Sequence, residues 1–340
     1  MGLLAKLKID GFMIAILAAV GIAALLPASG RGEDVLDWVV VGAIALLFFL
    51  YGARLEPAEA VAGLRHWRLH TTILCFTFIV FPLIGLALRP ALSPVIGETL
   101  TIGVLFLCVV PSTVQSSIAF TSIARGNVAG AIVSASLSNI LGVFLTPLLV
   151  IALISTTGGV TISGMAIVDI CLQILLPFVL GQLSRPWTAR WVSRQKRLLR
   201  FTDRGTIVLV VYAAFSKGMN EGIWSRVGLA DILILIALSV LLVTGLLWLT
   251  RYTATRLGFS RPDQIAIQFC GTKKSLATGL PMAAIIFSGG QVGAIVLPLM
   301  IFHQVQLMIC SWLAGHYARQ YDASHRASPA DPATGPPGSS

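Results

Sequence analysis

Long apolar runs recur along almost the whole chain, and they constrain the fold more than any other feature. A helix needs about 20 mostly apolar residues to cross roughly 30 Å of hydrocarbon. Charged residues make up 11% of the sequence, against about 25% in soluble domains. We therefore expect an all-α polytopic membrane protein with ten transmembrane helices. The ten runs are 11–27, 36–53, 70–88, 99–123, 128–154, 163–184, 205–217, 230–250, 262–288 and 291–315.

The first run is short and follows Lys6 and Lys8, a pattern that is also typical of a cleaved signal peptide. We expect a retained helix, because its removal would spoil the repeat described below. The five cysteines all fall inside apolar runs and none forms a C-x-x-C pair. No zinc site or disulfide framework is therefore predicted.

The distribution of lysine and arginine predicts the orientation in the membrane. With the N-terminus in the cytosol, 18 of the 24 basic residues fall on the cytosolic side, four fall outside and two lie within the ninth run. Basic loops favour the cytosolic side. We expect a multi-pass protein of the cytoplasmic membrane with both termini in the cytosol. The net charge of +10 thus orients the chain in a lipid bilayer and does not indicate a nucleic-acid partner.

The number of spans predicts an internal repeat. Two groups of five spans must enter the membrane in opposite orientations, which is the inverted-repeat architecture of many secondary transporters. We expect a single membrane domain. Within it, residues 1–184 hold the first five-span repeat and the first helix of the second, 185–204 form a basic cytosolic loop, 205–318 hold the remaining spans, and 319–340 form a disordered tail rich in proline and small residues.

Polar residues interrupt the fourth span of each half. Residues 111–117 have the sequence Pro-Ser-Thr-Val-Gln-Ser-Ser, and residues 271–281 have the sequence Gly-Thr-Lys-Lys-Ser-Leu-Ala-Thr-Gly-Leu-Pro. Proline removes a backbone donor and disrupts the helical ladder. Non-helical backbone at membrane depth is tolerated only within protein or beside a water-filled cavity. Interrupted segments at matching places in two halves point to a transporter's binding site. We therefore expect two broken helices, one in each repeat.

Lys273 and Lys274 lie near the middle of the ninth span, where a lysine costs about 2.5–3.5 kcal/mol on insertion scales. Such residues face a cavity or a partner, and the alternative is that they bind carbonyl groups of the broken helix. Asp169 is the one carboxylate clearly inside a span, and its depth does not favour a pair with the lysines. The site is therefore positive and short of acids. It predicts a small anionic substrate, and a free metal cation is harder to accommodate.

The candidate substrate- or ion-binding residues are polar side chains in the two broken spans and in their neighbours, the fifth and tenth spans. For the serines of the fifth span, helix packing and bonds to their own helix are an alternative role. The candidates are Ser112, Thr113, Gln115, Ser116, Ser117, Ser134, Ser138, Asn139, Thr272, Lys273, Lys274, Ser275, Thr278, His303 and Gln304.

Six segments carry a resemblance to a known family, namely 49–55, 63–69, 111–129, 134–147, 269–281 and 297–313. Through them the chain resembles the bile acid:sodium symporter family, and within it the subgroup related to the seventh member of solute carrier family ten. The resemblance implies ten helices, a panel domain, a core domain and two broken helices that cross near the ion sites. It also implies that Ser116 and Ser117 lie near the first crossing and that 272–275 lie on the second.

The sequence departs from this family at the second crossing. Sodium-coupled members place a glutamate and amide side chains there, whereas residues 269–275 contain two lysines and no carboxylate. A lysine ammonium could occupy the space of a sodium ion. We expect no cofactor, and sodium coupling, sodium independence and proton coupling stay open.

The pattern favours a secondary active transporter of an organic anion, bile-acid-like or otherwise amphipathic, that works by alternating access. A non-transporting regulator of calcium homeostasis is the alternative, and saturable uptake would separate the two. An intramembrane enzyme that pairs Ser275 or Ser117 with a lysine is chemically possible, but the chain has no triad order and no metal motif. We therefore expect no enzyme. The identity of the substrate and the oligomeric state are not predicted.

Overall fold

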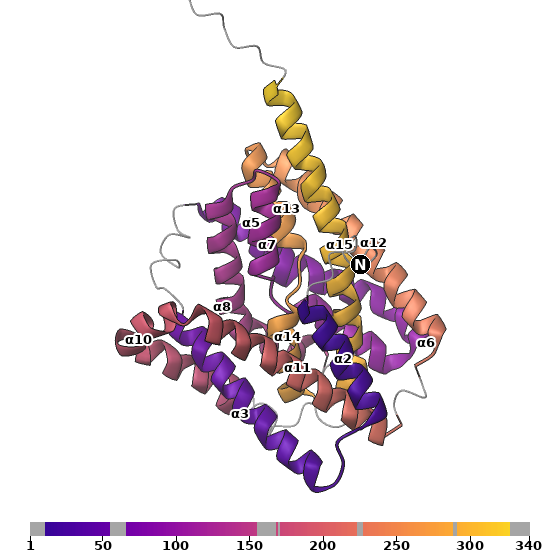
Figure 1. The fold of residues 1–340 in the computed structure, drawn as a ribbon. Helices are drawn as coiled ribbons and strands as arrows, with labels where there is room; N and C mark the ends of the chain where they lie inside the picture. Colours follow the sequence, from indigo (N-terminus) through magenta and orange to yellow (C-terminus); the bar gives the residue numbers. More distant parts are fainter. Residues whose placement is uncertain are drawn as a thin grey trace, which may run out of the picture.

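The computed structural model describes residues 11–54, 66–154, 168, 171–222, 227–287 and 291–326, and this part of the chain is helical with short connections and no strand (Figure 1). Asp169 and parts of the predicted sixth span and tail lie outside the described residues. The α-helices are α2 (Gly11–Leu25), α3 (Arg31–Arg54), α5 (Trp67–Cys75), α6 (Phe81–Val109), α7 (Gln115–Ile123), α8 (Val128–Leu153), α10 (Leu176–Arg194), α11 (Lys196–Asn220), α12 (Leu229–Arg256), α13 (Arg261–Thr272), α14 (Leu276–Ile286) and α15 (Gln291–Arg326). Two π-helical turns, η1 (Phe76–Val80) and η3 (Cys171–Leu175), precede α6 and α10.

Five helical stretches among the described residues are long and apolar enough to cross a membrane. The shorter apolar helix Ile14–Leu25 lies near the start of the chain. The all-helical fold with membrane character is therefore confirmed, while the count of ten spans and the inverted repeat stay predictions. The five stretches are Arg31–Arg54, Trp67–Val109, Val128–Leu153, Leu229–Arg256 and Gln291–Ala323.

The stretch Trp67–Val109 bends sharply at Gly97, whose φ of 77° and ψ of 164° are not helical. At about 1.5 Å per residue, its 43 residues would otherwise extend roughly twice the thickness of the hydrocarbon core. Glu98 fixes the bend, because its two carboxylate oxygens accept hydrogen bonds from Arg89 and Ser93, each at 2.7 Å. This bend lies between the two spans predicted over 70–88 and 99–123.

Four helices, α2, α3, α10 and α11, pack together as one group, which we call the panel helices (Figure 1). The helices α3 and α10 approach very closely, because a side chain on Gly52 would overlap the carbonyl oxygen of Phe178, and one on Gly181 would overlap that of Phe49. Small residues allow this kind of approach between membrane helices. The panel helices therefore form a tightly packed unit.

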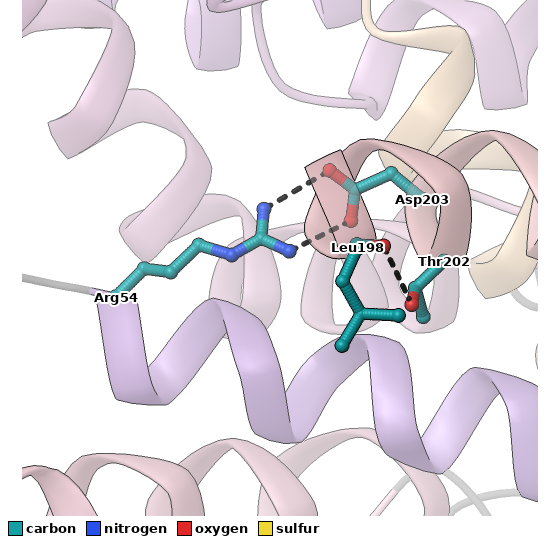
Figure 2. Close-up of polar contacts among 4 residues, drawn as sticks. All are labelled: Arg54, Leu198, Thr202 and Asp203. Atoms are coloured by element: carbon teal, nitrogen blue, oxygen red, sulfur yellow. Dashed lines mark hydrogen bonds and ion pairs between the residues drawn. The ribbon is translucent and has the colours of Figure 1, made fainter. Parts of the chain in front are cut away.

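Ion pairs connect α3 and α11 at two positions. Arg54, the last residue of α3, donates two parallel hydrogen bonds of 3.0 Å to the carboxylate of Asp203 on α11, as Figure 2 shows. Near the other end of α3, the ammonium of Lys217 contacts Asp37 and Glu33. The two helices are thus fixed relative to each other along most of their length.

The segment 185–204 differs from the loop that we predicted, because helices α10 and α11 cover it and only Gln195 separates them. Val192 and Leu199 from this segment are buried against Leu50 and Ala53 of α3. This packing, together with the bidentate pair at Asp203, explains why a segment rich in arginine is helical. Its place on the cytosolic side stays a prediction.

The predicted tail also differs at its beginning, because α15 continues to Arg326. Side chains of this extension contact the rest of the protein: Asp322 lies 4.0 Å from Arg125, and Gln320 accepts a hydrogen bond from Arg261. The rest of the tail, 327–340, lies outside the described residues.

The remaining helices, α5–α8 and α12–α15, form a second group, which we call the core helices (Figure 1). Side-chain caps start α8, α13 and α14. Asn127 accepts a hydrogen bond from the backbone of Gly130 at the start of α8, and Ser260 does the same for Asp263 at the start of α13. The helices α14 and α15 pack against α11 of the panel helices, so the two groups meet beside the broken helices.

Candidate functional site at the crossing of two broken helices

The two predicted breaks are confirmed, and they lie against each other in the core. The first separates α6 from α7, with an extended backbone at Val110 (φ −71°, ψ 153°). The second separates α13 from α14, with an extended backbone at Lys273 (φ −89°, ψ 150°). The backbone N–H of Ser275 donates a hydrogen bond of 2.8 Å to the carbonyl oxygen of Pro111. We call this region, residues 110–114 and 273–275, the crossing.

The two breaks have different local causes. At the first, proline disfavours a helical conformation of the preceding residue, and Val110 is accordingly extended before Pro111. At the second, Pro281 lies inside α14 and away from the break, so our attribution of this break to proline is wrong. Ser275 instead caps α14, because its Oγ accepts a hydrogen bond of 3.2 Å from the backbone of Thr278.

A network of polar side chains connects the crossing to α8. Ser112 donates a hydrogen bond of 2.6 Å to the carbonyl oxygen of Cys270, and its backbone N–H donates to Ser138 at 3.0 Å. Asn139 donates to the carbonyl oxygen of Ser112 and accepts from the hydroxyl of Thr278, both at 2.8 Å. Four predicted site residues thus hold the two broken helices and α8 together.

A second group of hydroxyls lies at the start of α7, with Thr113 in the break and Ser116 and Ser117 in the first turn. Thr113 lies 2.6 Å from Ser116 and 3.3 Å from Ser117, oxygen to oxygen. Ser117 donates a hydrogen bond of 3.4 Å to the carbonyl oxygen of Phe269 on α13. Gln115 is exposed and Ser116 is half-buried. This edge of the crossing is the part where predicted residues are accessible.

The ammonium of Lys274 is completely buried and binds three backbone carbonyl oxygens. It donates to Thr77 at 2.8 Å, to Cys108 at 2.7 Å and to Val110 at 2.9 Å. It also lies 4.2 Å from the centre of the Phe81 ring. The alternative that we left open, binding of the lysines to carbonyl groups, describes Lys274, but the carbonyl groups belong to η1 and to the end of α6 and not to its own broken helix.

Gln306 on α15 holds the backbone of the same residue. Its amide accepts a hydrogen bond from the N–H of Lys274 and donates one to the carbonyl oxygen, each at 2.9 Å. The amide nitrogen also lies 2.9 Å from Nδ1 of His303. His303 therefore reaches the crossing through Gln306.

Lys273 is equally buried, but its ammonium has no hydrogen-bond partner among the described residues. It lies 3.6 Å from the centre of the Phe120 ring and 6.0 Å from that of Phe269. Within the described part of the chain, neither lysine forms an ion pair with a carboxylate. The crossing thus contains one ammonium with a full set of oxygen partners and one ammonium that faces aromatic rings.

Three predicted residues take no direct part in these contacts. Thr272 lies 3.5 Å from Thr250 of α12, oxygen to oxygen, and Ser134 lies 2.7 Å from the ring of His70. Gln304 is half-buried on α15. Thr272, the last residue of α13 before the break, and Ser134 on α8 therefore contact neighbouring helices.

Three residues that contact the crossing were absent from our candidates. Gln306 belongs to the same polar patch of the tenth span as two candidates, so the sequence did contain a signal for it. The sequence contained no signal for Phe120 or Thr77. Both lie inside apolar runs, where an aromatic residue is ordinary and where every residue has a backbone carbonyl. The π-helical geometry of η1, which includes Thr77, is not visible in the sequence either.

The geometry gives no support to an enzyme or a metal centre among the described residues. The Lys274 ammonium donates to carbonyl oxygens, and the hydroxyl of Ser275 donates to Thr278 at 3.1 Å. No described cluster of three or more His, Cys, Asp or Glu side chains could hold a metal ion. The crossing thus combines two helix breaks with two buried ammonium groups.

Comparison with known proteins agrees with this geometry. Residues 10–319 match the model of the SBF-like CPA transporter family. The chain is 52% identical to an uncharacterised protein of Pseudomonas aeruginosa and 46% identical to the Escherichia coli protein YfeH, whose name proposes a symporter. It is 31% identical to the rat protein named sodium/bile acid cotransporter 7. Each comparison covers 92% of this chain and 94% of the relative. The resemblance to the bile acid:sodium symporter family is thereby confirmed, and the chain belongs to the SBF-like CPA transporter family of membrane transporters.

Proposed function

We propose that this protein is a secondary active transporter of an organic anion, that it works by alternating access, and that the anion binds at the crossing. The observation that supports the proposal most is the buried ammonium of Lys273, which has no hydrogen-bond partner among the described residues. An ammonium buried without a counter-charge is costly, and an aromatic ring compensates for only about 2 kcal/mol of that cost. An anionic group beside Lys273 would remove this cost.

The surrounding helices support the same substrate class. Both α7 and α14 begin at the crossing, and the N-terminal end of a helix carries a partial positive charge. In transporters with broken helices, such ends face anionic groups of the substrate. Phe120 and Phe269 add apolar surface beside Lys273. This combination suits an amphipathic anion, and the name of the rat relative makes a bile acid the first substrate to test.

Alternating access would follow from the division into two helix groups. The panel helices are fixed to one another by close backbone contacts and by the pair of Arg54 with Asp203. The crossing belongs to the core helices, and α14 and α15 face α11. A movement of one group against the other would expose the crossing first to one side of the membrane and then to the other. We place the protein in the cytoplasmic membrane with both termini in the cytosol.

Uptake of radiolabelled taurocholate into vesicles of purified protein tests the proposal. The assay compares a sodium gradient, a potassium gradient and a proton gradient, with protein-free vesicles as the control. Other amphipathic anions, such as steroid sulfates, serve as competitors. We expect saturable uptake that unlabelled anions inhibit and that neutral or cationic amphiphiles do not. An absence of saturable uptake for every anion under every gradient would contradict transport and favour a regulator.

A further inference from the structure

The oxygen atoms around the Lys274 ammonium form a closed set contributed by three separate backbone positions. Thr77 lies in the π-helical turn η1, whereas Cys108 and Val110 lie at the end of α6. All three oxygen–nitrogen distances are between 2.7 and 2.9 Å, and all three oxygens belong to backbone carbonyls. We call these three oxygens the carbonyl cage.

The fold leaves these oxygens available. The last four carbonyl groups of a helix have no partner within the helix, and Cys108 and Val110 occupy this position because α6 ends at Val109. The same end of the helix carries a partial negative charge, which attracts cations. The π-helical turn alters the ordinary pairing of carbonyls around Thr77. The cage is therefore built by the backbone at a helix end and a π-helical turn.

Its chemistry is that of a site for a small cation. Backbone carbonyl oxygens are ligands of alkali-metal ions in proteins, where they replace the hydration shell. A lysine ammonium is a compact charge with three donors, and Lys274 uses all three on the cage. The neighbouring Lys273, by contrast, donates a hydrogen bond to no carbonyl oxygen of the described residues. The match between three donors and three acceptors is specific to Lys274.

We propose that Lys274 is a tethered cation, which permanently fills a site that the crossing would otherwise need to fill with a free monovalent cation. In the transporter proposed above, sodium then has no role at this position, and the crossing stays assembled in its absence. The site left by removal of the side chain would take Na⁺ or a small alkylammonium ion. The inference concerns the coupling ion of the proposed function, and it is tested without substrate.

The test measures the thermal midpoint Tm of the full-length protein in detergent, in choline chloride, potassium chloride, sodium chloride and methylammonium chloride at one ionic strength. The wild type is compared with Lys274→Ala, Lys274→Met and Lys273→Ala. We expect the wild type to have the same Tm in every salt. Lys274→Ala should lose several degrees in choline and regain most of the loss, saturably, in Na⁺ or methylammonium. Binding to the folded state alone raises Tm in this way.

The two other variants are matched controls. Lys274→Met keeps an unbranched chain of similar length that occupies the space without a charge, so added cations should not restore its Tm. Lys273→Ala removes the neighbouring charge and opens no carbonyl cage, so its Tm should be the same in all four salts.

Three results would overturn the proposal. The first is a wild type whose Tm rises saturably with Na⁺ compared with K⁺ and choline. The second is a Lys274→Ala variant whose Tm in choline equals that of the wild type. The third is a Lys274→Ala variant whose lowered Tm is restored by none of the cations. If Lys274→Ala does not fold, the response of the wild type to Na⁺ still decides. The Tm test contains no substrate, so its failure would not contradict anion uptake. An absence of uptake would likewise not contradict the Tm result for the carbonyl cage.

Discussion

The backbone N–H of Ser275 donates a 2.8 Å hydrogen bond to the carbonyl oxygen of Pro111, so each helix break satisfies a polar group of the other. Backbone groups that lack helical partners at membrane depth must find partners within the protein. Here the two breaks provide one for each other, and the side chains of Ser112, Ser138 and Asn139 provide more. The crossing is consequently one structural unit, and a displacement of either break should disturb both.

Gly142 on α8 lies directly behind the first break, and its substitution should displace the crossing. A Cβ atom at this position would come within 2.7 Å of Cβ of Pro111. We expect Gly142→Ala to lower the stability by about 1–3 kcal/mol and to reduce uptake by about tenfold. Gly245→Ala on α12 is the matched control, because nothing lies within 4 Å of its added Cβ. Equal uptake by the two variants would contradict a rigid crossing.

Gln306 should matter more than its neighbour Gln304. The amide of Gln306 makes two hydrogen bonds to the backbone of Lys274 and is buried, whereas Gln304 is half-buried. Removal of one partner of a buried hydrogen bond costs about 1–3 kcal/mol. We therefore expect Gln306→Leu to lower Tm by several degrees and Gln304→Leu to change it little, as measured by fluorescence-detected unfolding in detergent. A larger loss of Tm for Gln304→Leu than for Gln306→Leu would show that the two hydrogen bonds from Gln306 to the backbone of Lys274 contribute little to stability.

Arg54 and Asp203 should be energetically coupled. Their two parallel hydrogen bonds have the geometry of a strong pair, and the side chains are 28% and 18% exposed. We expect a coupling energy of about 1 kcal/mol, at the upper end of the range for partly exposed pairs. A double-mutant cycle with Arg54→Gln and Asp203→Asn measures it from unfolding in denaturant. Additive effects of the two substitutions would mean that the pair contributes nothing to the panel helices.

The sequence predicted the helical membrane fold and the two breaks because these depend on local composition. The apolar runs, the proline at 111 and the polar stretch around 273 can all be read directly in the sequence. The segment 185–204 was predicted as a loop because its charge is visible, whereas the buried contacts of Val192 and Leu199 with α3 depend on tertiary packing. Long-range contacts of this kind have no local signal.

The candidate site shows the same limit. The residue types at the crossing were predicted, and the structure brings most of them together. The different surroundings of Lys273 and Lys274 were not predictable, because adjacent residues in an extended segment point to opposite sides and meet different helices. The partners of Lys274 are carbonyl oxygens, and every residue has one. Only the fold determines which of them are free.

The central claim is that the crossing binds an anion through Lys273, and uptake by a charge-neutral variant tests it most directly. Taurocholate uptake into vesicles would be measured for the wild type, Lys273→Met and Lys273→Arg, with equal amounts of folded protein confirmed by size-exclusion chromatography. We predict saturable uptake by the wild type, a loss of at least tenfold in Lys273→Met, and partial retention in Lys273→Arg, which keeps the charge. Uptake by Lys273→Met equal to that of the wild type would contradict the account.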